Sequence, residues 1–165
     1  MEREIVDEID KKSKFIVLNI LIAIAISISA LLIISSNLNI FFMGNIPTFR
    51  TAVVAVVFLV VWLFYGMVMG YMKKKNFIKF ISFYWGISGS VAYFILPIGK
   101  LAILAIPVMI LTLAPTYGLK YFINIGSHEL FYGIMCIILS WLAGAIGYLF
   151  GYLLKKLRVR ALSNQ

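Results

Sequence analysis

The sequence alternates between long apolar runs and short polar connections. Four of the runs are long enough to cross a membrane as helices: residues 15–34, 51–72, 77–96 and 130–154. A helix needs about 20 apolar residues to cross a hydrocarbon core of about 30 Å, because each residue adds about 1.5 Å. The pattern therefore predicts an all-α integral membrane protein with four transmembrane helices.

A fifth apolar stretch, residues 101–114, is too short for a regular span. Its fourteen residues carry no charge, but Pro97 precedes them, Pro107 interrupts them and Pro115 follows them. Proline removes a backbone donor and breaks helices, and a stretch of this length is typical of a re-entrant or interfacial segment. We predict that residues 97–129 form an apolar outer segment containing such a helix. Five or six spans are the alternative.

Composition and charge agree with a protein whose solvent is lipid. Hydrophobic residues make up 63% of the chain and its mean hydropathy is +1.03, more than the polar surface of a water-soluble fold can cover. The net charge of +9 would suit nucleic acid, but the basic residues are grouped at the ends of the apolar runs. Such clusters set topology and contact anionic headgroups. We therefore expect the lipid bilayer as a partner, and no nucleic acid.

The basic residues also predict the orientation of the chain. With four spans and both termini in the cytoplasm, twelve of the 15 lysines and arginines are cytoplasmic, and only Arg50, Lys100 and Lys120 lie outside. A fifth span at 101–114 reduces this ratio to nine against six. Positive charge accumulates in short cytoplasmic loops, so four spans are favoured. We expect a multi-pass protein of a prokaryotic cytoplasmic membrane.

The same pattern divides the chain into three parts. Residues 1–14 form a cytoplasmic amphipathic segment, residues 15–156 a single transmembrane helical domain, and residues 157–165 a basic cytoplasmic tail. The amphipathic segment holds five of the six acidic residues and a narrow apolar stripe.

Two of the apolar runs end in the same way, which suggests an internal repeat. Gly66-x-x-x-Gly70 and Gly147-x-x-x-Gly151 are each followed by a tyrosine and then by lysines. If each half begins and ends in the cytoplasm, the four spans form two parallel-repeat hairpins. Chance similarity between apolar sequences is the alternative.

Small residues form one stripe on each of the two repeated helices. The candidates for helix packing or for an interface share four-residue spacing: Gly66 and Gly70, and Ala143, Gly147 and Gly151. Small residues at this spacing let helix backbones approach closely in a membrane. The stripes predict packing within one chain, or an interface with a second copy or another membrane subunit.

Neutral polar residues predict a second candidate site. Ser27 and Ser29 lie at a depth comparable to that of Ser88 and Ser90 in the equivalent helix. They are candidates for a polar pocket between the halves. Interhelical hydrogen bonds are the simpler interpretation.

The outer segment supplies the remaining candidates for a binding site: Lys100, Pro107, Pro115, Tyr117, His128 and Glu129. The segment either binds a partner or ligand, or closes the outer mouth of the bundle. His128 and Glu129 form an adjacent acid-base pair, but they follow a serine suited to cap the last span. No second ligand cluster or nucleophile set accompanies them, and Cys136 stands alone in an apolar run. We expect no catalytic residue, metal or cofactor.

These observations predict a non-enzymatic multi-pass membrane protein that serves as a subunit or accessory factor of a larger membrane transport assembly. The alternative is a small oligomeric transporter, substrate-binding membrane component or channel. An intramembrane enzyme acting on lipid is the weakest hypothesis, because the sequence lacks the groups that such chemistry needs.

Overall fold

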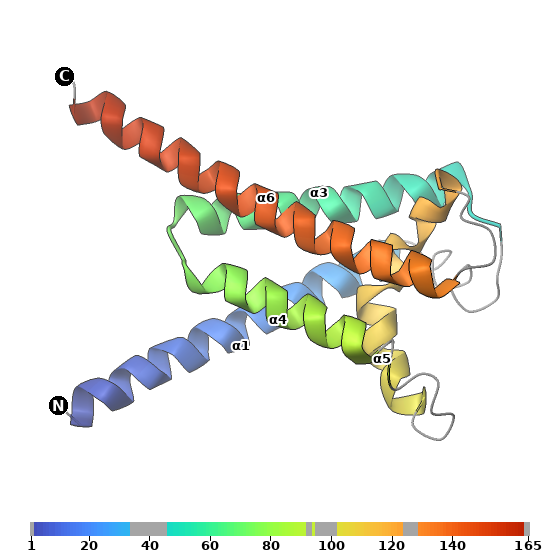
Figure 1. Cartoon of the computed structure of the whole chain (residues 1–165), viewed down its shortest axis with the longest axis horizontal. Helices are drawn as coiled ribbons and strands as arrows, with labels where there is room; N and C mark the ends of the chain where they lie inside the picture. The colour runs from blue at the N-terminus through green and yellow to red at the C-terminus, as the bar shows by residue number, and fades with distance from the viewer. Residues whose placement is uncertain (1, 34–45, 92–93, 95–101, 124–128, 164–165) are drawn as a thin grey trace.

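The computed structural model describes residues 2–33, 46–91, 94, 102–123 and 129–163, and these residues form helices and turns with no strand among them (Figure 1). The described elements are α1 (Glu2–Ile33), α3 (Phe49–Tyr71), α4 (Asn76–Ser90), α5 (Ala102–Thr112), the 3-10 helix η3 (Ala114–Tyr121) and α6 (Glu129–Ser163). The all-α prediction is confirmed for this part of the chain.

Three helices are long and apolar enough to cross a membrane, which confirms a membrane-embedded protein. The qualifying segments are Ser13–Ala30 of α1, Phe49–Tyr71 and Phe131–Ala161 of α6. The predicted fourth span, residues 77–96, is described only at residues 77–91 and 94, and α4 includes those up to Ser90. The other residues of this span lie outside the described part of the chain. Four spans and two repeated hairpins therefore stay predictions.

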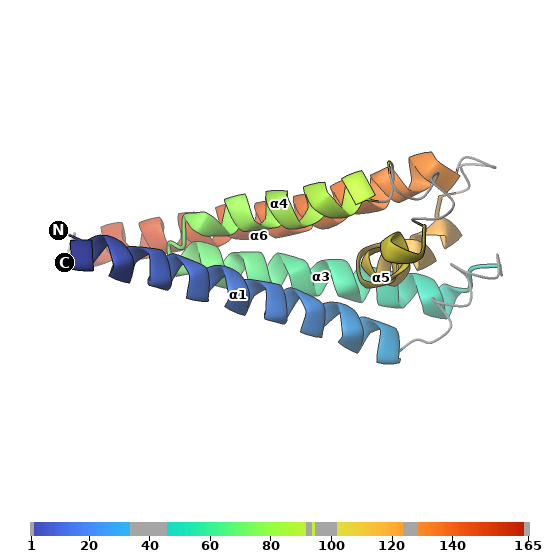
Figure 2. The same ribbon diagram turned by 90° about the horizontal axis from the view of Figure 1, so that it is seen from below.

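Helices α1, α3, α4 and α6 alternate in direction along the bundle (Figure 1). Both chain termini lie at one end, together with the turn that connects α3 to α4 (Figure 1). We call this the terminal end. In both views α5 and η3 lie toward the opposite end (Figure 2). The most extensive packing joins α3 to α6, whereas α4 packs mainly on α6, and α1 makes only sparse contacts with its neighbours.

Two long helices run through the segments that the sequence pattern treats separately. Residues 2–33 form one helix, so the amphipathic segment is continuous with the first span. No glycine or proline interrupts this stretch, which explains why the helix continues. At the other end of the chain, α6 has 35 residues and a rise of about 52 Å, so it includes most of the basic tail and extends beyond one hydrocarbon core.

Local chemistry fixes both ends of α3. At its start, Thr51 N donates to Thr48 Oγ1 over 3.4 Å and Thr48 N donates to Thr51 Oγ1 over 2.9 Å, a reciprocal capping pair. At its end, Lys73 adopts a φ of 56°, and its N–H donates to the Gly70 carbonyl over 2.9 Å. The tight reversal into α4 requires this left-handed conformation, which costs a lysine about 1 kcal/mol.

Aromatic side chains fill the core between α3, α4 and α6. The rings of Trp62 and Trp85 pack edge to face with centroids 5.2 Å apart, and Phe77 stacks on Tyr148 at 5.9 Å. Trp141 Nε1 also donates to Ser82 Oγ over 3.0 Å, which joins α6 to α4. These contacts hold α4 to the α3–α6 pair and leave one flank of α4 free to face α1.

Candidate functional site

The glycine stripes of α3 and α6 face each other within the chain. A Cβ atom added at Gly70 would lie 1.9 Å from the Tyr148 carbonyl oxygen, and one added at Gly147 would lie 2.0 Å from the Leu63 carbonyl oxygen. Gly66 and Gly151 are equally tight against the opposing backbone. The two helices therefore meet backbone to backbone, which only glycine permits at these positions.

This arrangement places the predicted interface residues inside the molecule. Ala143 is only half-buried, and Gly144 takes the inner position instead, with its carbonyl oxygen 2.2 Å from the Cβ that Gly66 lacks. The spacing of four selected Ala143, whereas helical geometry also allows a step of three from Gly144 to Gly147. With the stripes facing each other, a second copy or another subunit would have to bind elsewhere on the surface.

The outer segment packs into the bundle in its second half. All residues from 114 to 119 of η3 are buried, including Pro115 and Tyr117. A Cβ at Gly118 would lie 2.0 Å from the Thr51 carbonyl oxygen, so η3 also touches the α3 backbone. The Tyr132 hydroxyl of α6 donates to the Tyr117 carbonyl oxygen over 3.2 Å. This geometry suits a segment that closes the bundle.

The other outer candidates are described only in part. Pro107 lies within α5 and is exposed. Lys100 and His128 lie outside the described residues, and Glu129 begins α6 without a described side chain.

The four serine candidates separate into two classes. Ser27 and Ser88 are buried. In contrast, Ser29 and Ser90 are exposed and donate to carbonyl oxygens of their own helices over 2.7 and 2.9 Å. Only the buried pair lies in the region between α1 and α4, so the proposed polar pocket is reduced to two hydroxyls.

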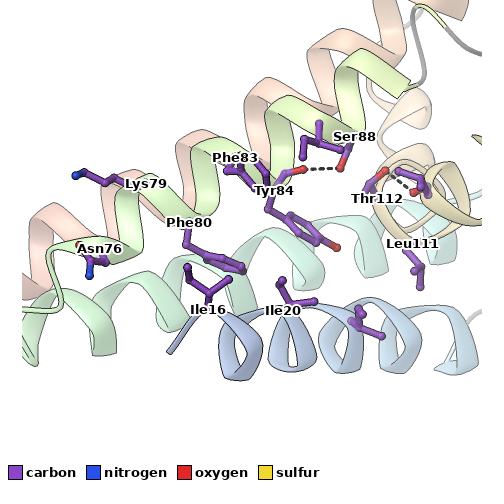
Figure 3. A pocket seen from close by; sticks show the side chains of 13 residues that line it. Ile16, Ile20, Asn76, Lys79, Phe80, Phe83, Tyr84, Ser88, Leu111 and Thr112 are labelled. Atoms are coloured by element: carbon purple, nitrogen blue, oxygen red, sulfur yellow. Dashed lines mark hydrogen bonds between the residues drawn. The ribbon is translucent and has the colours of Figure 1, made fainter. Parts of the chain in front are cut away.

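A cavity of about 700 Å³ lies between α1, α4 and α5 (Figure 3). We call it the lateral cavity. Its walls are mainly aliphatic and aromatic: Ile16, Ile20 and Ile24 of α1; Phe80, Phe83, Tyr84, Ile87 and Ser88 of α4; and Val108, Leu111 and Thr112 of α5, with Asn76 and Lys79 at one end. Phe80 and Tyr84 point across the gap toward Ile16 and Ile20 (Figure 3).

The hydroxyls in the cavity wall are either hydrogen-bonded to their own helices or buried. Ser88 Oγ donates to the Tyr84 carbonyl oxygen over 2.7 Å, and Thr112 Oγ1 donates to the Val108 carbonyl oxygen over 2.7 Å. The Tyr84 hydroxyl oxygen is buried beside Ser27 Oγ, and neither oxygen makes a hydrogen bond of good geometry. The interior of the lateral cavity therefore offers a guest apolar surface.

A polar contact attaches the α1 wall to α3. The Tyr65 hydroxyl of α3 donates to Asn19 Oδ1, and Asn19 Nδ2 donates to the Phe15 carbonyl oxygen over 2.6 Å. Asn19 is fully buried. A buried side-chain amide in a membrane helix needs such a partner, which explains its position against α3.

Sequence reasoning missed the lateral cavity, although its pattern is visible in the chain. The α1 wall repeats isoleucine every fourth residue from Ile16 to Ile24. The α4 wall places large apolar residues at 80, 83, 84 and 87, a spacing that puts them on one helical face. In an apolar chain, nothing distinguishes a face that lines a cavity from one that meets lipid.

Within the described part of the chain, no group of three or more His, Cys, Asp or Glu residues is placed to hold a metal ion. Comparison of the sequence with protein-family models and with curated proteins, and of the structure with solved structures, finds no match.

Proposed function

We propose that this protein is a non-enzymatic, multi-pass membrane component that binds an apolar molecule in the lateral cavity. The observation that carries the proposal is the cavity itself. Its volume of about 700 Å³ falls within the range of about 300 to 1,000 Å³ typical of small-molecule sites. The sequence predicts either an accessory subunit or a transporter, substrate-binding component or channel. A substrate-binding membrane component fits this geometry best.

The proposal includes four spans with both termini in the cytoplasm. In it, α4 and the residues that follow form the fourth span. The position of the termini supports this topology, because both lie at the same end of the bundle as the lysine-rich α3–α4 turn (Figure 1). Basic residues favour the cytoplasmic side.

Photolabelling with an apolar probe tests the proposal. We would incubate the purified protein in nanodiscs with an alkyl diazirine, irradiate it and identify the labelled peptides by mass spectrometry. We expect labels to concentrate on the cavity faces of α1, α4 and α5. Ile20→Trp fills the cavity and should remove these labels, whereas Leu21→Trp, on the exposed surface of the same helix, should leave them.

Uniform labelling of all exposed apolar residues would contradict the proposal, and so would unchanged labelling in Ile20→Trp. The thermal midpoints of the two tryptophan variants report whether both remain folded. If Ile20→Trp does not fold, Ile87→Trp on the opposite wall provides the same test.

A second candidate function, an accessory subunit of a larger membrane assembly, is favoured by the C-terminal end of α6. This helix extends beyond the bundle at the terminal end, and its residues 156–161 are exposed (Figure 1). Native mass spectrometry of the protein extracted from its own membrane tests this function. A defined hetero-complex that is lost on deletion of residues 157–165 would support it, and a free chain in both cases would contradict it.

A further inference from the structure

We propose that the lateral cavity holds one acyl chain of an anionic membrane lipid, with the lipid headgroup at Lys79 on the terminal end of the bundle. This inference rests on the proposed function, because it requires an occupied cavity, and it adds the chemical class of the occupant. Three properties of the cavity lead to it: the separation of polar from apolar wall, the charge at its rim and its length.

The polar groups available to a guest are at one end of the cavity. Asn76 and Lys79 are exposed at this end, next to the α3–α4 turn. The Lys79 side chain extends away from the apolar interior, where Phe80 faces Ile16 (Figure 3). Deeper in, the hydroxyls of Ser88 and Thr112 donate to carbonyl oxygens of their own helices, and the Tyr84 hydroxyl oxygen is buried. A guest with one polar end and one apolar chain matches this division, because its polar end stays at the rim.

The rim is cationic on its α4 side. Lys79 lies four to six residues after three exposed lysines of the α3–α4 turn, at positions 73 to 75. No acidic residue occurs in the sequence between positions 11 and 128, so α3, α4 and α5 carry no carboxylate. Helix α1 carries five carboxylates within residues 2–10, before its cavity-wall residues begin at Ile16. The α4 N-terminus adds the positive end of its dipole, and its N-cap, Lys75, makes no side-chain capping bond. A negative headgroup is favoured over a neutral one at such a rim.

The length of the cavity suits one leaflet. From Asn76 to Ser88 the α4 wall rises about 18 Å, which is slightly more than half of a hydrocarbon core of about 30 Å. The far end is closed by Val108, Leu111 and Thr112 of α5. A chain that begins at the headgroup level of the terminal side therefore ends near the middle of the bilayer, as an acyl chain of that leaflet does.

Native mass spectrometry with defined lipids tests the inference. We would titrate the full chain in detergent with phosphatidylglycerol, which is anionic, and with phosphatidylcholine, which is zwitterionic. A lysine near a negatively charged lipid surface contributes a factor of about five in affinity. We expect tighter binding of phosphatidylglycerol, and we expect Lys79→Gln to reduce that preference about fivefold while binding of phosphatidylcholine stays unchanged.

A matched variant and the apolar probe separate the outcomes. Lys156→Gln removes an exposed lysine of the α6 extension, outside the cavity lining, and should leave the preference intact. Equal affinities for the two lipids, or equal effects of the two lysine variants, would overturn the inference. If the apolar probe still labels the cavity in that case, the proposed function stands. Absence of labelling overturns both. A dimer that excludes lipid would instead place a second copy at the cavity.

Discussion

Replacement of Gly147 by alanine tests the backbone contact between α3 and α6. The new Cβ would lie 2.0 Å from the Leu63 carbonyl oxygen and 2.8 Å from its carbonyl carbon. Both atoms belong to the backbone, so no side-chain rotation relieves the clash. The helices must separate by about 1 Å before the contact reaches even the shortest distance that Cβ atoms adopt.

The expected loss follows from two opposing terms. Overpacking of this kind costs about 1 to 3 kcal/mol. Alanine in a helix interior gains about 1 kcal/mol over glycine, which partly offsets the cost. Gly86→Ala isolates the gain, because a Cβ at Gly86 meets nothing within 4 Å. The two variants should therefore differ in their free energies of unfolding by about the full overpacking cost of 1 to 3 kcal/mol.

Reversible unfolding in mixed micelles, followed by circular dichroism, measures this difference. Gly147→Ala should unfold at a lower denaturing-detergent fraction than Gly86→Ala. Gly70→Ala should lower the free energy of unfolding less in the Gly147→Ala background than in the parent chain, because the helices are already separated there. Equal free energies of unfolding for Gly147→Ala and Gly86→Ala would refute the backbone contact.

Three further predictions concern other parts of the molecule. Asn19→Leu removes the acceptor of the Tyr65 hydroxyl and should lower the free energy of unfolding by about 0.6 to 1.7 kcal/mol; stability equal to the parent chain would show that this bond does not hold α1. Tyr132→Phe should cost about 1 kcal/mol in the same assay, because the Tyr117 carbonyl oxygen loses the hydroxyl donor and the Thr116 carbonyl oxygen keeps only the Cys136 thiol; an unchanged value would contradict this packing. With the single cysteine replaced by serine, Lys75→Cys and Arg160→Cys should react with an impermeant maleimide from the same side of sealed vesicles, and labelling from opposite sides would overturn the four-span topology.

The sequence predicted the helices better than it predicted their contacts. Apolar length alone placed the first, second and last spans close to α1, α3 and α6. Apolar length and the prolines predicted a helix in the outer segment, and the structure has α5 and η3 there. These features depend on local hydropathy and on proline, which a single sequence displays directly.

The contacts depend on which helix surfaces pack against each other, and the local sequence of one helix does not specify its partner. The glycine spacing marked α3 and α6 as close-packing helices but not as partners of each other, and it selected Ala143 where Gly144 lies at the contact. The lateral cavity was missed for a related reason. Its walls come from three helices, and each apolar face by itself is the same as one that meets lipid.

The backbone contact between α3 and α6 gives the molecule one stiff part and one compliant flank. No methyl group separates the two helices along the glycine stripe, so they cannot slide apart without losing contact along its length. The lateral cavity does not use either helix as a wall; it lies among α1, α4 and α5, with α1 only sparsely packed. Under the proposed function, a guest of greater girth would displace α1 sideways while the α3–α6 pair keeps its shape. Adaptation to different guests would then be confined to the part of the protein where movement breaks the fewest contacts.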